Sequence, residues 1–196
     1  MILHNTKLKN ELKKIEQKYP ELVDVLVFGS VVRGKVHPTD VDILVLFKRI
    51  VDKSVEYVVR KVLERYIQNI SIISKVERAV CDATFDARES VLFEAKSLLT
   101  GKNRAQEYGF SSFGMFKYGF GRWSTLQKTK FYYALNGRGT RGIIDTVQGI
   151  KLADSVIIVP LEFVEEFRRF LERWKIEFVY VPMIIPTRMG KKSILG

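Results

Sequence analysis

The chain of 196 residues has a single cysteine, Cys81, and only two histidines, His4 and His37. One thiol cannot form an internal disulfide, and so few ligands cannot build a cysteine-rich zinc site. No apolar run approaches the roughly 20 residues that cross a bilayer, and polar residues interrupt the N-terminal stretch where a signal peptide would lie. We therefore expect a cytoplasmic protein that makes no membrane contact.

Acidic residues are outnumbered, with 22 Asp and Glu against 33 Lys and Arg and a net charge of +11. The excess is concentrated in residues 100–151, where nine basic and two acidic residues supply seven of the eleven net charges. Nine of the 13 glycines and many aromatic residues lie in the same segment. Solubility alone can explain a moderately basic protein, but a concentrated positive field favours a phosphate-rich partner.

Hydrophobic periodicity predicts alternating helices and strands in the first hundred residues. Leu8, Leu12 and Ile15 form the apolar stripe of a first helix, for which Asn5 is a suitable N-cap. We predict helices at residues 5–19, 52–67 and 89–99 and strands at residues 23–28, 40–47 and 78–86.

The composition changes after Gly101, where glycines and basic residues replace the regular pattern. Regularity returns with a strand at residues 155–160, a helix at 161–174 and a strand at 176–182, a βαβ-like unit. We predict an α/β (α+β) protein with a mixed-sheet domain at residues 1–103. A smaller basic module at residues 104–196 follows it and ends in the βαβ-like unit.

The most informative residues lie between the first two predicted strands. Gly29 and Ser30 follow the first strand, and Asp40 and Asp42 open the second. Glycine permits a tight turn, and a serine hydroxyl with the amides of a helix N-terminus can bind an anion. Alternate strand residues share a face, so the two carboxylates can bind one cation, for which oxygen ligands favour Mg²⁺ or Mn²⁺. Arg33, one helical turn beyond Ser30, can reach the same anion, which predicts a site for a metal-bound nucleoside triphosphate.

Gly29-Ser30, Arg33-Gly34 and the Asp40-Val41-Asp42 strand together resemble the DNA polymerase beta-like nucleotidyltransferase superfamily, in particular its minimal nucleotidyltransferases. The resemblance covers about residues 20–100. It implies a two-metal reaction in which Asp40, Asp42 and a third carboxylate from a neighbouring strand bind Mg²⁺. Asp82, expected in the middle of a strand, is the preferred third carboxylate. Asp86 is the alternative, although it is also a suitable N-cap for the next helix.

The basic middle segment interleaves cationic and aromatic side chains, a pattern that can bind phosphates and stack on exposed bases. The phenylalanines at 110, 113, 116 and 120 can equally form a core stripe, because they are spaced three or four apart. The candidates for nucleic-acid contact are Lys117, Arg122, Lys128, Lys130, Arg138 and Arg141.

These features predict an Mg²⁺-dependent nucleotidyltransferase that moves a nucleoside monophosphate from an NTP to a hydroxyl, most readily on an RNA or DNA end. Two alternatives stay open: nucleotidylation of a protein or small molecule, and a non-catalytic nucleic-acid-binding protein that kept the fold. The sequence identifies neither the preferred NTP nor the acceptor, and it does not give the oligomeric state.

Overall fold

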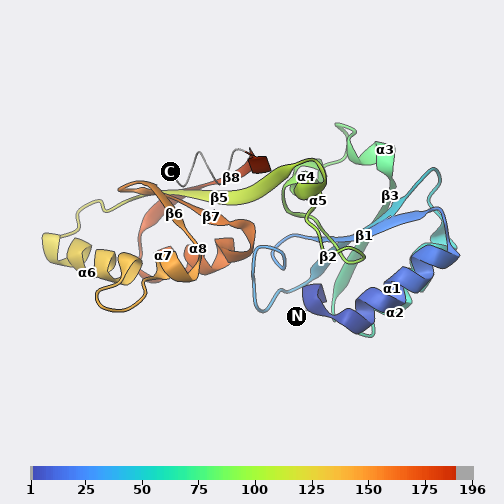
Figure 1. The fold of residues 1–196 in the computed structure, drawn as a ribbon, viewed down its shortest axis with the longest axis horizontal. Helices are drawn as coiled ribbons and strands as arrows, with labels where there is room; N and C mark the ends of the chain where they lie inside the picture. The colour runs from blue at the N-terminus through green and yellow to red at the C-terminus, as the bar shows by residue number, and fades with distance from the viewer. Residues whose placement is uncertain (1, 189–196) are drawn as a thin grey trace. The chain divides into compact units, whose positions relative to one another are not determined.

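A computed structural model describes residues 2–188 of the chain. Its contacts divide the chain into two compact units, which are coloured from blue to green and from green to red in Figure 1. The first unit contains residues up to Val32 and residues 36–108. The second contains the short segment Arg33–Lys35 and the residues from Gly109 onward.

The first unit is built on a four-stranded mixed sheet with the order β3-β2-β1-β4. Strand β1 (Leu22–Phe28) pairs antiparallel with β2 (Val41–Phe47) and with the short β4 (Lys96–Ser97). Strand β2 pairs in parallel with β3 (Ile70–Val76). The two central strands are almost wholly buried, as their continuous Val, Leu and Ile runs predict.

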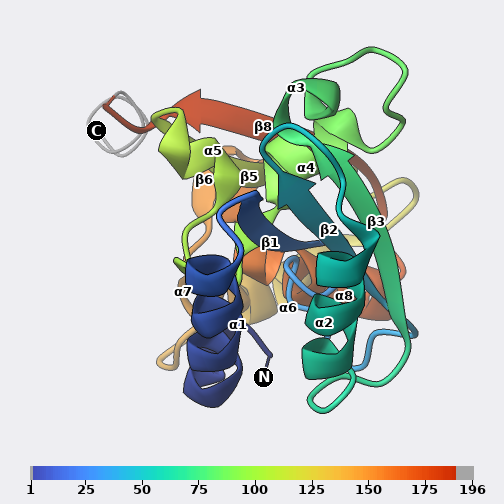
Figure 2. The same cartoon turned by 90° about the vertical axis from the view of Figure 1, so that its right-hand side faces the viewer.

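Helices cover both faces of this sheet. A 3₁₀ turn (Ile2–His4) leads into α1 (Thr6–Lys18), which packs beside α2 (Lys53–Leu63), as Figure 2 shows. Their N-caps are Asn5 and Asp52, whose side chains accept backbone N–H bonds. On the other face α4 (Arg88–Glu94) buries Val91 against Leu26 and Leu44. The short helices α3 (Glu77–Val80) and α5 (Arg104–Glu107) complete the unit.

The strand predicted at residues 78–86 is wrong, and the third strand is β3, immediately before it. Strand β3 was missed because it lies at the sheet edge, where half-exposed residues weaken the apolar pattern. After β3 the chain forms α3 and then a turn at Asp82–Thr84. Asp86 is also not the predicted helix cap, because α4 follows Ala87 without a side-chain cap bond.

The second unit contains an antiparallel sheet with the order β6-β7-β5-β8. Its elements follow the order β5 (Phe110–Gly119), α6 (Thr125–Asn136), α7 (Ile143–Thr146), β6 (Ile150–Ala153), β7 (Val156–Pro160), a 3₁₀ turn (Leu161–Phe163), α8 (Val164–Arg173) and β8 (Glu177–Pro186). Strands β7 and β8 both pair antiparallel with β5 and therefore run parallel to each other. The predicted βαβ-like unit is thus present, with β5 inserted between its two strands.

The core of the second unit is aromatic. Phe116, Phe131 and Phe167 are each 0% exposed. Phe116 meets Phe167 edge-on, and Phe170 joins Phe167 to Phe131 through one stacked and one tilted ring contact. Phe120 also packs against this core, so the core interpretation of the phenylalanine stripe is correct for Phe116 and Phe120. The predicted fold class, a mixed-sheet α+β domain followed by a second α+β module, is confirmed. Within residues 2–188 no helix is both long and apolar enough to cross a membrane.

Candidate functional site

A tight turn follows β1 at Gly29. The backbone of Gly29 has φ +82°, in the left-handed region that glycine enters without steric cost. The N–H of Val32 donates to the carbonyl of Gly29 at 3.1 Å, which closes the turn. Residues 30–34 continue as turns, so the helix N-terminus expected at Ser30 is absent from this part of the structure.

Asp42 lies directly beside this turn. It pairs with Phe28 in the antiparallel register of β1 and β2. A Cβ built on Gly29 would lie 2.8 Å from Oδ2 of Asp42, so the carboxylate occupies the space that the missing side chain leaves. Asp42 is half-buried, whereas Asp40 is exposed just before β2 begins at Val41. The fold therefore places Gly29 and Asp42 next to each other, as expected from the sequence motif.

Asp82 does not occupy the mid-strand position that was expected for a third carboxylate. It lies in an exposed turn, where its Oδ1 accepts bonds from the N–H and the hydroxyl of Thr84, both at 2.8 Å. These two bonds lower the pKa of Asp82. A local turn of this kind competes with strand pairing, which explains why the predicted strand does not form.

Strand β3 supplies no replacement carboxylate, because its sequence ISIISKV contains no acid. Its register places Ser71 opposite Asp42. Across the residues that the structure describes, no three His, Cys, Asp or Glu side chains are grouped so as to hold one metal ion. Asp40, Asp42 and Asp82 are therefore not brought together as a three-carboxylate cluster. Two carboxylates still suit Mg²⁺, which commonly binds one or two together with phosphate oxygens and water.

Glu94, the last residue of α4, is a carboxylate that the sequence interpretation missed. It is 3% exposed, and its Oε1 accepts the N–H of Gly29 at 3.0 Å. The sequence did contain an indication: Glu94 lies within the mostly apolar stretch VLFEAKSLL. An acid that is buried with such a stretch needs a specific partner.

Arg33 is grouped with the second unit and pairs with α8. Its Nε donates to Oε1 of Glu165 at 3.2 Å, and its carbonyl accepts the N–H of Glu165 at 3.1 Å. Gly34 has φ +92°, and a Cβ there would lie 2.2 Å from the carbonyl oxygen of Glu162. The Arg-Gly pair of the motif is thus held by α8 and by the 3₁₀ turn before it, and contact of Arg33 with a nucleotide stays a prediction.

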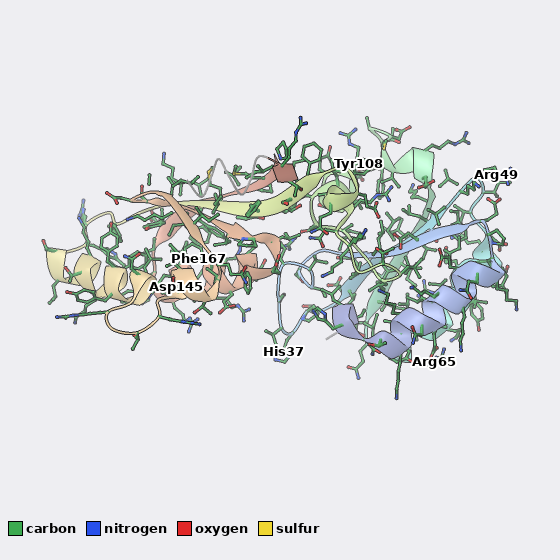
Figure 3. All side chains as sticks on the ribbon, viewed as in Figure 1. His37, Arg49, Arg65, Tyr108, Asp145 and Phe167 are labelled. Carbon is green, nitrogen blue, oxygen red and sulfur yellow. The ribbon has the colours of Figure 1, made fainter. Side chains whose placement is uncertain are left out.

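The six predicted nucleic-acid-binding residues all lie in the second unit. Lys117 is on β5, Arg122 precedes α6, Lys128 and Lys130 are on α6, and Arg138 and Arg141 are in the loop before α7. Five of them are exposed, and Lys128 is half-buried. Within residues 2–188 none of the six forms an ion pair with an acidic side chain. Asp145, labelled in Figure 3, is the single acid in the sequence between Gly109 and Lys151.

Aromatic rings support some of these cations. The guanidinium of Arg138 lies 4.7 Å from the ring centre of Tyr133, which is 43% exposed. The ammonium of Lys128 lies 5.8 Å from the ring of Phe120. Most rings of the segment, however, pack in or against the aromatic core, which also contains Phe167 of α8, labelled in Figure 3. Core packing therefore accounts for most of these rings, whereas Tyr133 on α6 is exposed, and its stacking on a base stays a prediction.

Comparison with known families agrees with the motif. Residues 7–98 match the model of the nucleotidyltransferase domain. This match confirms the resemblance to the nucleotidyltransferase superfamily for the N-terminal part of the chain. No curated protein matches the chain.

Several solved structures that resemble part of this chain are toxin–antitoxin complexes. A tri-AMPylated HEPN toxin of Shewanella oneidensis with its MNT antitoxin matches at 20% identity and a TM-score of 0.33, over 52% of this chain and 76% of that chain. A toxin–antitoxin with AMP-PNP matches at 21% identity and a TM-score of 0.36, over 51% of this chain and 78% of that chain. An MntA–HepT complex matches at 18% identity and a TM-score of 0.33, over 53% of this chain and 79% of that chain.

Proposed function

We propose that the protein is a nucleotidyltransferase that moves a nucleoside monophosphate from an NTP to a hydroxyl on an RNA or DNA end. The observation that supports the transfer is the close approach of the Asp42 carboxylate to the Gly29 turn, within a region that matches the nucleotidyltransferase domain. A polar turn beside a carboxylate can bind a triphosphate and its cation from two sides.

Asp40 and Asp42 are the proposed ligands of Mg²⁺ or Mn²⁺. Asp42 is held against the turn, while the exposed Asp40 can turn toward a cation that enters with the nucleotide. The bound ion would neutralise the triphosphate charge and polarise the reacting phosphate. Ser30 is the proposed hydroxyl donor to a phosphate oxygen, with Arg33 as a further candidate. Asp82 is not a proposed ligand, because its Oδ1 accepts two bonds within its own turn.

In the proposed reaction the oxygen of the acceptor hydroxyl forms a bond to the α-phosphorus. The bond from that phosphorus to the bridging oxygen breaks, pyrophosphate leaves, and the hydroxyl proton passes to solvent. The residues beside the turn contribute mainly by orienting the triphosphate, because a fixed geometry can lower the barrier substantially.

Charge distribution supports a nucleic acid as the acceptor. The six basic residues from Lys117 to Arg141 belong to a segment that carries most of the positive excess, and no ion pair with an acid engages them among the described residues. Cations of this kind can neutralise phosphates without first breaking an ion pair with an acidic side chain. We place the reaction in the cytoplasm, where the exposed thiol of Cys81 would stay reduced.

Labelled NTPs, Mg²⁺ and a mixture of small RNAs and DNA oligonucleotides test the proposal. We expect Asp42→Asn to lower incorporation by about a thousandfold or more and Asp40→Asn to lower it similarly, since each loses a charged ligand of a catalytic ion. Glu64→Gln is the matched control, because Glu64 is an exposed acid at the end of α2 that pairs with Lys61. Full incorporation by both aspartate variants would reject the assignment.

The same assay separates the acceptors. Label on RNA or DNA supports the proposal, whereas label on a protein or small molecule with none on nucleic acid would assign the other acceptor class. Salt-dependent RNA or DNA binding without pyrophosphate release from any NTP would instead indicate a binding protein that has lost transfer.

A further inference from the structure

The buried carboxylate of Glu94 has no role in the reaction described above. Glu94 is the last residue of α4 and is 3% exposed, although acids are rarely buried without a specific reason. A negative charge at the C-terminal end of a helix also opposes the helix dipole. Neither helix stability nor core packing favours an acid at this position, so its contacts must explain it.

One contact of Glu94 is with the Gly29-Ser30 turn, the proposed nucleotide-binding turn. Its Oε1 accepts the N–H of Gly29 at 3.0 Å, and the two residues are 65 positions apart in the sequence. Gly29 has φ +82°, which strains any L side chain, and a Cβ there would lie 2.8 Å from Oδ2 of Asp42, which would have to shift. Glu94 thus holds the backbone of the turn from one side, and Asp42 lies against it on another.

This arrangement separates the tasks of the two carboxylates. Glu94 is on the helix that packs on the sheet through Val91, so its position is fixed by the core rather than by a ligand. It is not part of any three-residue metal cluster among the described residues. The Gly29 amide is used by Glu94, which leaves the Ser30 hydroxyl as the expected phosphate donor of the turn.

We propose that Glu94 is a positioning residue for the nucleotidyl transfer: it fixes the Gly29-Ser30 turn against Asp42, so that the triphosphate and its cation bind in a reactive geometry. This inference rests on the proposed function. The property that matters is a hydrogen-bond acceptor at the Glu94 side-chain end, because the acceptor holds the amide. Loss of this bond should misplace the turn, and small misplacements of a reactive group can cost about a hundredfold in rate.

Two substitutions separate the acceptor from the charge. Glu94→Gln keeps a carbonyl acceptor of the same reach and removes the charge, whereas Glu94→Leu removes both. We expect Glu94→Leu to lower kcat by about a hundredfold with a smaller change in KM for the NTP, and Glu94→Gln to stay within about tenfold of wild type. Gly29→Ala should also lower kcat, because φ +82° strains an alanine and its Cβ would displace Oδ2 of Asp42. Glu89→Gln is the matched control, since Glu89 is an exposed acid of the same helix.

A second set of measurements tests the conformation of the turn independently of catalytic activity. Hydrogen exchange of the ¹⁵N-labelled Gly29 amide should be unchanged in Glu94→Gln and clearly faster in Glu94→Leu. Calorimetry with Mg²⁺ and non-hydrolysable analogues of the four NTPs should show weaker analogue binding in Glu94→Leu alone. Near-native circular dichroism identifies variants that fold, and Glu94→Gln keeps the test available if the leucine variant does not.

Three results would overturn the inference. The first is unchanged Gly29 exchange in a folded Glu94→Leu. The second is unchanged kcat in that variant. The third is a Glu94→Gln variant as inactive as the leucine variant and restored by higher Mg²⁺, which would assign the charge to metal binding. If wild type transfers no nucleotide to any acceptor, the proposed function fails, while amide exchange and analogue affinity still decide the role of Glu94.

Discussion

The two units of this protein are both built on four-stranded sheets, but they carry different kinds of side chains. Each has four strands with helices packed on the sheet, but the first is mixed and the second is antiparallel. The first unit places Asp42 and Glu94 around one glycine turn. The second unit buries rings in its core and presents exposed cations in a segment nearly free of acids. In the proposed function, carboxylate chemistry therefore belongs to the first unit and phosphate attraction to the second.

The largest predicted effect is the loss of stability caused by a substitution in the aromatic core of the second unit. Phe131 is 0% exposed and contacts Tyr118, Phe120 and Phe170 through its ring. We expect Phe131→Ala to destabilise this unit by about 3–5 kcal/mol, because it removes buried area and leaves a cavity. Urea unfolding followed by tryptophan fluorescence measures it, since both tryptophans, Trp123 and Trp174, pack against this core.

Leu126→Ala is the control for that measurement, because Leu126 is 65% exposed in the same helix, α6. We expect it to change stability by less than about 0.5 kcal/mol. Equal midpoints for wild type and Phe131→Ala would contradict the aromatic core as the source of the second unit's stability.

Charge-reversal variants with the same change in net charge, one in each unit, test which unit attracts a nucleic acid. We expect Lys130→Glu with Arg138→Glu to weaken RNA or DNA binding by about tenfold or more and to reduce the slope of log affinity against log salt by about two. Both side chains are exposed, and Arg138 also lies over the ring of Tyr133. Fluorescence anisotropy over a salt series measures both quantities.

Lys13→Glu with Lys14→Glu is the matched control, because these are exposed lysines of α1 in the first unit and the net charge changes equally. We expect a clearly smaller loss of affinity. Equal losses in the two double variants would show that total charge, and not the second unit, attracts the nucleic acid.

The smallest predicted effect concerns a buried acid of the first unit. Burial raises the pKa of Asp24, although the Ser97 hydroxyl and the Val25 N–H both donate to its carboxylate. A raised folded-state pKa means that the folded chain binds more protons than the unfolded chain above pH about 4, so stability falls as pH rises through that window. We expect the free energy of unfolding of Asp24→Asn, minus that of wild type, to increase from pH 4 to pH 7.

Asp52 supplies a comparison of opposite sign. The Ser54 hydroxyl and the N–H groups of Val55 and Ser54 donate to its carboxylate and lower its pKa, so its contribution is present above pH about 4 and is lost as pH falls. Wild type should therefore lose stability relative to Asp52→Asn on acidification. Urea unfolding of wild type and both variants from pH 3 to pH 7 measures these differences. If the free energies of both variants relative to wild type changed with pH in the same direction, the burial argument for Asp24 would be contradicted.

Much of the fold was predictable from the sequence, because hydrophobic periodicity reports how each local segment is buried. The apolar stripe of α1 with its Asn5 cap, the buried β1 and β2, and the β7–α8–β8 unit were all identified in this way. The sequence also predicted that Gly29 and Asp42 belong to one site; the fold places them side by side, and their roles in nucleotide and metal binding stay a prediction. Edge strand β3 was missed because half-exposed residues give a weak period.

By itself the sequence determined which residue types were available: a glycine-serine turn, acids at a strand start, and a concentrated surplus of cations. Only the tertiary structure decided which of them meet. Glu94 reaches Gly29 across 65 positions, Arg33 pairs with Glu165 across 132, and Asp82 stays in its own turn. The reason is that periodicity describes one element at a time, whereas a site forms from strand order and helix packing, which no local pattern contains.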